Sequence, residues 1–82
     1  MMRITVKLFA ILRDRAGVSE IPLDLPEQCD VSAASAAIAE RLPAIADFLP
    51  RVAHAVNREY MPTTTTLEDG DELALIPPVS GG

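Results

Sequence analysis

One amphipathic helix is the longest regular pattern in this chain, and it limits the folds that the chain can adopt. Apolar side chains recur every three or four positions between about residues 31 and 42, which is the spacing of one helix face: Val31, Ala34, Ile38 and Leu42. The carboxylate of Asp30 can accept amide hydrogens of the first turn, and Pro43 stops the pattern because its ring denies the continuing hydrogen bond. One principal helix covers only one face of a small sheet, so the strands must form a single layer against it.

The strands are indicated by residues that alternate between apolar and polar. We predict strands over residues 3–9, 19–25, 52–57, 60–61 and 72–76, with a turn at 68–71. Pro22 lacks an amide hydrogen, which places the second strand at an edge of the sheet. Two short helical segments are also predicted: one at 11–15, stopped by Gly17, and one that packs Ile45, Phe48 and Leu49 and ends before Pro50.

This order of elements, β-β-α-β-(β)-β, predicts an α+β protein with a β-grasp, or ubiquitin-like, fold. Such a fold has a mixed sheet with one principal helix packed on one face. We assign residues 1–76 to this β-grasp domain and residues 77–82 to an extended C-terminal tail that ends in Gly-Gly.

The tail begins stiffly and ends without side chains. Pro77 and Pro78 fix φ and lack amide hydrogens, so the chain leaves the sheet without pairing further. Gly81 and Gly82 are slim enough to enter a narrow channel. The reactive group that we assign to the tail is the α-carboxylate of Gly82. Joined to AMP it becomes an acyl donor, and a sulfur nucleophile that displaces AMP would leave a thiocarboxylate.

Charge and cysteine content exclude several other classes. Twelve acidic against seven basic side chains give a net charge of -5, so we expect no nucleic-acid partner. The first ten residues are interrupted by Lys7 and form neither a signal peptide nor a membrane span. The single cysteine, Cys29, suits a reducing cytoplasm, and we expect it to be a buried filler. His54 has no second ligand in sequence reach, so we expect no metal site.

The candidate partner surface follows from the strand pattern. Phe9 and Ile76 each lie opposite the inward residues of their strands, and the first and last strands of a β-grasp are central neighbours. We therefore expect the two side chains to lie together on the face away from the helix as an exposed apolar pair. Tyr60 is expected to add to this contact, Arg13 to lie at its rim, and Pro77, Pro78 and Val79 to continue it. The alternative is that loops such as the one with Tyr60 simply cover this face.

Four stretches of the chain resemble the small subunits of molybdopterin synthases. They are residues 6–10 with Arg13 and Gly17 after them, residues 55–57, residues 67–73, and above all residues 77–82. The resemblance covers nearly the whole chain and is weakest in the alanine-rich helix. The turn at 69–71 and the Gly-Gly end are shared with the thiamine sulfur carrier, whereas the diproline favours the molybdopterin branch.

This resemblance implies a sulfur carrier in molybdenum cofactor biosynthesis. An ATP-dependent activating enzyme would adenylate Gly82, sulfur would be loaded as a thiocarboxylate, and the tail would deliver it to cyclic pyranopterin phosphate. The catalytic site is expected on the large subunit, in a heterotetramer, and no cofactor is expected to stay bound to this chain. Two alternatives remain open: a carrier for thiamine, cysteine or tRNA thiolation, and a ubiquitin-like modifier or binding module without sulfur chemistry.

Overall fold

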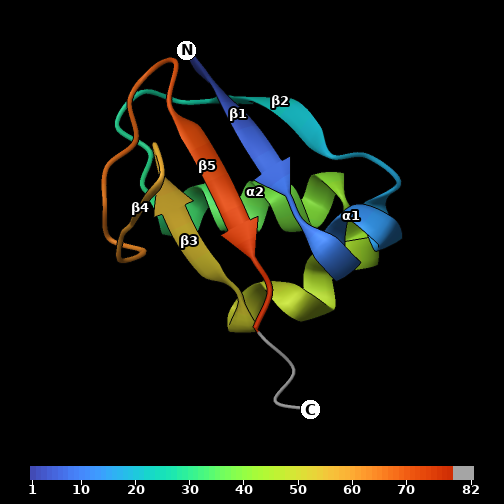
Figure 1. The fold of residues 1–82 in the computed structure, drawn as a ribbon. Helices are drawn as coiled ribbons and strands as arrows, with labels where there is room; N and C mark the ends of the chain where they lie inside the picture. Colours follow the sequence, from blue (N-terminus) through green and yellow to red (C-terminus); the bar gives the residue numbers. More distant parts are fainter. Residues whose placement is uncertain (79–82) are drawn as a thin grey trace.

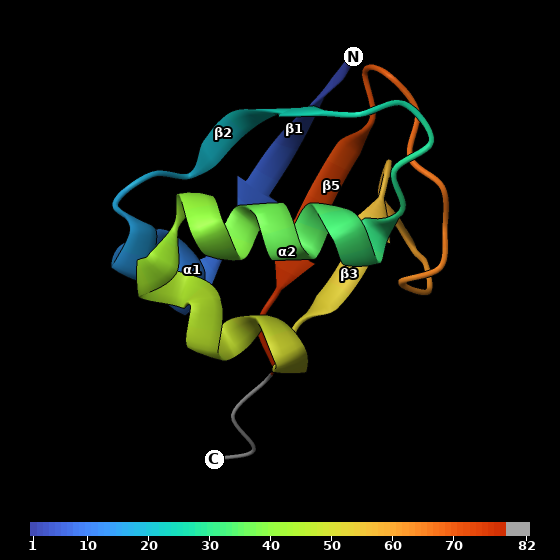
Figure 2. The same cartoon turned by 180° about the vertical axis from the view of Figure 1, so that it is seen from behind.

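The computed structural model describes residues 1–78, which form one sheet with helices on one of its faces. In chain order the elements are β1 (Met2–Leu8), α1 (Ala10–Ala16), β2 (Glu20–Leu25), α2 (Val31–Arg41), the 3-10 helix η1 (Pro43–Arg51), β3 (Ala53–Val56), β4 (Glu59–Tyr60) and β5 (Glu72–Ile76). The strand order is β2-β1-β5-β3-β4, and α2 crosses one face of this sheet (Figures 1 and 2). This is the β-grasp arrangement predicted from the sequence.

The first and last strands are parallel neighbours at the centre of the sheet, as predicted. Val6 is paired with Leu73 and Leu8 with Leu75, while the other strand pairs are antiparallel. Alternate residues of β1 and β5 point toward α2 and are buried. With residues of the helices, of β2 and β3, and of the connecting segments they form one apolar core: Met2, Ile4, Val6, Leu8, Leu12, Ile21, Leu23, Leu25, Cys29, Val31, Ala34, Ile38, Ile45, Leu49, Val52, Val56, Leu67, Leu73 and Leu75.

Pro22 lies on the edge strand β2, opposite Thr5. The amide of Thr5 donates to the carbonyl of Asp71, on the β5 side. Residues directly opposite in an antiparallel pair either exchange both hydrogen bonds or make neither. The nitrogen of Pro22 therefore faces the outer edge, where the missing hydrogen removes no bond from the sheet.

Several predicted boundaries change by one or two residues. The helix predicted to end at Leu42 ends at Arg41. β1 is displaced by one residue to Met2–Leu8, and β3 is shortened at both ends to Ala53–Val56. The prediction that the second short helical segment ends before Pro50 was wrong, because η1 runs through this proline to Arg51. A 3-10 helix needs an amide from position 50 to reach the carbonyl of Asp47, and the guanidinium of Arg51 supplies a long substitute contact of 3.5 Å to that oxygen.

Asp30 caps α2 as predicted. Its Oδ1 accepts the amide of Ala33 at 2.8 Å, which satisfies one of the free donors of the first turn. We expect Asp30→Ala to lower the free energy of unfolding by about 1 kcal/mol. Urea unfolding followed by circular dichroism checks this. Asp47→Ala is the matched control, because that exposed carboxylate makes no hydrogen bond among the described residues. Equal urea midpoints for the two variants would contradict the capping role.

Left-handed backbone conformations close two of the connections. Gly17 ends α1 with φ of 78°, and its amide donates to the carbonyl of Arg13. Asn57 and Arg58 have φ of 50° and 72° in the two-residue turn between β3 and β4, where twisted hairpins favour such values. The side-chain Nδ2 of Asn57 donates to Asp71, and its Oδ1 accepts the backbone amide of Glu72, which ties this turn to the start of β5. Within residues 1–78, none of the helices has the length and apolar character that a membrane span requires.

Candidate functional site

Phe9 and Ile76 come together at one end of the sheet. Phe9 has extended backbone angles between β1 and α1, so its side chain continues the alternation and points opposite to Leu8. Leu8 is paired with Leu75, so one step further along these parallel strands brings Phe9 level with Ile76. Phe9 keeps 44% of its surface exposed. The predicted proximity of these two side chains is confirmed.

The two side chains line an open apolar groove of about 810 Å³. Its other walls come from the start of α1, the end of η1 and the chain after β5: Ala10, Ile11, Phe48, Arg51, Pro77 and Pro78. We call these eight residues the tail groove. It lies where the sheet meets α1 and η1, so the two side chains are part of a concave surface rather than of a flat sheet face. The prediction that both are exposed was wrong for Ile76, which is half-buried.

The tail starts in this groove. β5 ends at Ile76, and Pro77 and Pro78 follow directly as lining residues. The predicted site residues Val79, Gly81 and Gly82 lie outside the described residues, so their roles stay predictions. The described part of the tail thus begins at the same apolar surface that Phe9 and Ile76 form.

Tyr60 lies elsewhere on the same face of the sheet. It is on the edge strand β4, opposite Ala55, which is in turn opposite Ala74 of β5. Its side chain is 71% exposed and does not line the tail groove. Two buried alanines, Ala55 and Ala74, thus separate Tyr60 from β1 on this face.

The groove also contains residues that the sequence did not point to. Arg13, predicted at the rim, is exposed on α1 but does not line the groove, whereas Ile11 does. Phe48 was expected in the core with Ile45 and Leu49, yet it is only half-buried and lines the groove. The guanidinium of Arg15 lies 5.4 Å from the centre of its ring, a cation–π contact that holds the ring in place.

The only lysine of the chain lies on this side of the sheet. The ammonium of Lys7 is 3.4 Å from a carboxylate oxygen of Glu72 on the neighbouring strand, and both side chains are about one-third exposed. Lys7 occupies the same cross-strand row as Ala74, Ala55 and Tyr60. Part-exposed ion pairs of this kind contribute little to stability. The pair supplies charge beside an otherwise apolar region.

Cys29 is buried, as expected for a filler. It is 8% exposed, and its Sγ donates to the carbonyl of Asp30 at 3.6 Å. Burial, with the neighbouring Asp30 carboxylate, raises the pKa of this thiol. A raised pKa lowers the thiolate fraction at neutral pH, so Cys29 is poorly suited to carry sulfur. Residues 1–78 contain no cluster of three metal-ligating side chains.

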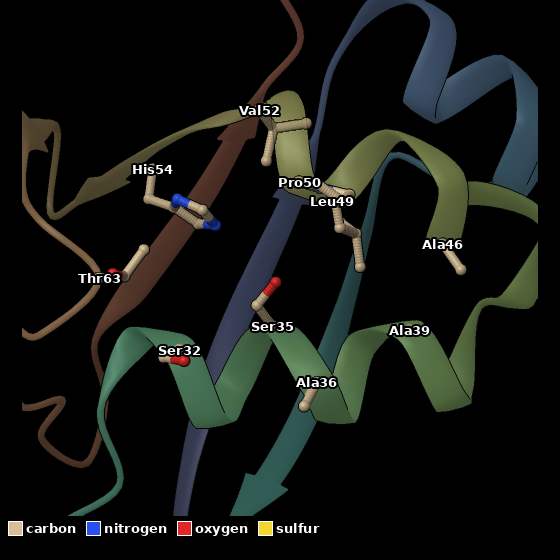
Figure 3. A pocket seen from close by; sticks show the side chains of 10 residues that line it. All are labelled: Ser32, Ser35, Ala36, Ala39, Ala46, Leu49, Pro50, Val52, His54 and Thr63. Carbon is tan, nitrogen blue, oxygen red and sulfur yellow. The ribbon is translucent and has the colours of Figure 1, made fainter.

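His54 is the one buried polar side chain among the core residues that the structure describes. It points from β3 toward the α2 side of the sheet, and its Nε2 has no hydrogen-bond partner there (Figure 3). Burial lowers the pKa of His54, because the charged imidazolium would lose its hydration. The histidine is therefore neutral in the folded chain at neutral pH.

This pKa shift predicts that acid weakens the fold. Below pH about 6.5 the unfolded chain binds a proton at position 54 that the folded chain does not, so the free energy of unfolding falls as the pH falls toward the folded pKa. His54 is the only histidine, so few other side chains titrate between pH 5.5 and 7.5. Urea unfolding across this range should show a slope that His54→Leu removes. Identical slopes in both proteins would contradict the prediction.

Comparison with known proteins identifies the family. Residues 6–82 match the model of the ThiS family. A molybdopterin synthase sulfur carrier subunit from Chlamydomonas reinhardtii is 37% identical, over 99% of this chain and 100% of the relative.

Two solved structures have the same fold. SAMP1 from Haloferax volcanii superposes with a TM-score of 0.88 at 31% identity, over 98% of this chain and 99% of that one. A chain in the complex of subunits 1 and 2 of molybdopterin-converting factor from Helicobacter pylori gives 0.72 at 26% identity, over 99% of this chain and 100% of that one. The ubiquitin-like β-grasp core, the diproline exit at its apolar groove and these matches together show that the chain belongs to the ThiS family, among relatives of the molybdopterin synthase sulfur carrier subunits.

Proposed function

We propose that this chain is the sulfur carrier of a molybdopterin synthase and holds sulfur as a thiocarboxylate on Gly82. The observation that carries the proposal is the full-length similarity to a molybdopterin synthase sulfur carrier subunit, at 37% identity. The tail groove supports it, because the chain that leads to Gly82 leaves the sheet beside an exposed apolar surface.

The chemistry proposed for the tail has three steps. An activating enzyme joins the Gly82 carboxylate to AMP from ATP and releases pyrophosphate. A sulfur nucleophile then attacks the acyl carbon and expels AMP, which leaves a thiocarboxylate. Its sulfur displaces an oxygen substituent from a side-chain carbon of cyclic pyranopterin phosphate, so that a carbon–sulfur bond forms as a carbon–oxygen bond breaks. Water then cleaves the acyl–sulfur bond, which restores the carboxylate and leaves sulfur on the pterin. This chain acts as co-substrate, and the catalytic groups belong to the large subunit.

The partner assigned to the tail groove is that large subunit. The Helicobacter pylori structure contains subunits 1 and 2 of molybdopterin-converting factor as a complex, and this chain is similar to one of its chains. Apolar anchors in a concave surface dominate most protein interfaces, and Phe9 and Ile76 have this character. We propose a heterotetramer in which a dimer of large subunits carries one carrier at each end.

The similarity to SAMP1 favours a second function, that of a protein modifier. SAMP1 from Methanosarcina acetivorans, another similar structure, is described as a small archaeal modifier protein. An acyl-adenylate on Gly82 could equally be attacked by a lysine amine, which would give an isopeptide bond to a target protein. The sulfur carrier is preferred because the full-length match to a carrier subunit has 37% identity, whereas SAMP1 is 31% identical.

Intact mass spectrometry of the chain isolated with its activating enzyme tests the proposal. Replacement of one oxygen by sulfur raises the mass by about 16 Da, and fragmentation must place the change on the last residue to exclude methionine sulfoxide. A variant without Gly82, prepared in parallel, should lack this species. A chain that stays unloaded when ATP, a sulfur donor and the activating enzyme are present would contradict the carrier function. Isopeptide adducts in its place would support the modifier.

A further inference from the structure

The tail groove contains one charged side chain, that of Arg51. Every other residue of its lining is apolar: Phe9, Ala10, Ile11, Phe48, Ile76, Pro77 and Pro78. Arg51 is the last residue of η1, which lies beside the end of β5 (Figures 1 and 2). Its side chain is exposed, so the positive charge faces solvent at the mouth of the groove. A partner that fills the groove therefore meets one cation in apolar surroundings.

No carboxylate of residues 1–78 pairs with this guanidinium. The ion pairs of the described chain use the N-terminus, Arg3 and Lys7 instead. Arg51 donates only to the backbone carbonyl of Asp47, and the distance of 3.5 Å is long for such a bond. A guanidinium carries several N–H donors, so most of them remain available to a partner.

The two other arginines at this end of the molecule do not line the groove. Arg13 and Arg15 lie on α1, and the guanidinium of Arg15 is placed over the ring of Phe48 at 5.4 Å. Arg51 is thus the cation that a side chain entering the groove would meet.

Binding changes the surroundings of Arg51. A partner that buries Phe9 and Ile76 also covers this guanidinium, because all three side chains line one groove. A charge that loses its hydration without gaining an opposite charge weakens a complex, whereas a paired charge fixes its orientation. The matching group is a carboxylate, which accepts two parallel N–H bonds from arginine.

A protein carboxylate fits this place better than the phosphates of a nucleic acid. The apolar lining suits an apolar side chain, which a protein surface can present next to an Asp or a Glu. The net charge of -5 repels a phosphate backbone.

We propose that Arg51 selects the partner of the tail groove by pairing with a carboxylate of the large subunit. This carboxylate lies beside the apolar side chain that fills the groove, so the partner is recognised by one charge and one apolar contact together. The assignment rests on the proposed function, because that function supplies the large subunit as the occupant of the groove.

Isothermal titration of the large subunit with the full-length chain tests this pairing. Arg51→Gln should raise Kd about tenfold, and Arg51→Glu about a hundredfold because like charges then meet. Arg51→Lys keeps the charge but loses the fork of donors, so its Kd should lie between those of the parent chain and Arg51→Gln. NaCl raised from about 50 to about 500 mM should weaken the parent complex more than that of Arg51→Gln, because salt screens the pair.

Arg41→Gln is the matched control, because this exposed arginine ends α2 and does not line the groove. It should bind like the parent chain. Urea unfolding checks that each variant folds, as expected for a side chain outside the buried core. If Arg51→Glu fails to fold, Arg51→Gln and its salt dependence decide the question.

A charge-reversal scan identifies the carboxylate. Each Asp and Glu of the large subunit is changed to arginine in turn, and one such variant should regain affinity for Arg51→Glu. Equal Kd values for the parent chain and both uncharged and reversed variants of Arg51 would overturn the pairing, as would a scan without any rescue. A parent chain that does not bind the large subunit would instead overturn the proposed function, and this pairing with it.

Discussion

Deletion of Gly82 is expected to abolish sulfur transfer while it leaves the fold and the affinity for the large subunit almost unchanged. Without Gly82 the terminal carboxylate belongs to Gly81, one residue earlier in the chain. It therefore cannot reach the point at which the Gly82 carboxylate would react. Among the described residues the last member of the buried core is Leu75, so we expect the deletion to leave the core intact. Addition of one residue after Gly82 should be as damaging, because it moves the acyl carbon by about 3.5 Å, far more than in-line attack tolerates.

Gly81→Ala should reduce transfer less than either change of length. The added methyl group restricts φ and widens the chain where we expect a narrow channel to close around it. Product formation from cyclic pyranopterin phosphate, measured beside a binding titration with the large subunit, separates chemistry from docking. Full transfer by the Gly82 deletion would end the carrier hypothesis. Lost binding with intact chemistry would mean that the tail, and not the groove, supplies the affinity.

The sequence predicted best the elements whose signals are local. Residues 72–76 became β5 with the expected bounds, because Leu73 and Leu75 alternate with outward residues and Pro77 ends the pairing. Asp30 caps its helix through a contact three residues away. The proximity of Phe9 and Ile76 was also predictable, since the order of elements makes β1 and β5 neighbours.

The shape of the site depends on packing between distant segments, which local patterns do not encode. Phe48 was assigned to the core by its spacing, but the contact between η1 and α1 turns it into a groove wall beneath Arg15. The helical segment was expected to end before Pro50, but η1 continues through it to Arg51, whose guanidinium contacts the Asp47 carbonyl that the proline leaves without an amide. From the sequence, His54 was taken as an ordinary strand residue. The alternating pattern places its side chain inward, but it does not show that α2 offers no hydrogen-bond partner there.

Phe9→Ala is expected to weaken the complex with the large subunit by more than about 1 kcal/mol, roughly a fivefold rise in Kd. The ring is the largest exposed apolar side chain in the tail groove, so a partner that fills the groove must bury it. The monomer should stay folded, because Phe9 lies outside the buried core cluster. Isothermal titration with the purified large subunit measures the affinity, and urea unfolding checks the fold.

Two further variants locate the interface on the sheet. Val18→Ala is the matched control, since this valine is 39% exposed, close to the value for Phe9, but does not line the groove. It should bind like the parent chain. Tyr60→Ala tests whether the partner also contacts β4, beyond Ala55 and Ala74. A loss of affinity similar to that of Phe9→Ala would mean that one partner contacts both regions. If Phe9→Ala binds with unchanged affinity, the tail groove is not the anchor. Tyr60 would then be the better candidate for the anchor, because it is the most exposed aromatic side chain of the described residues.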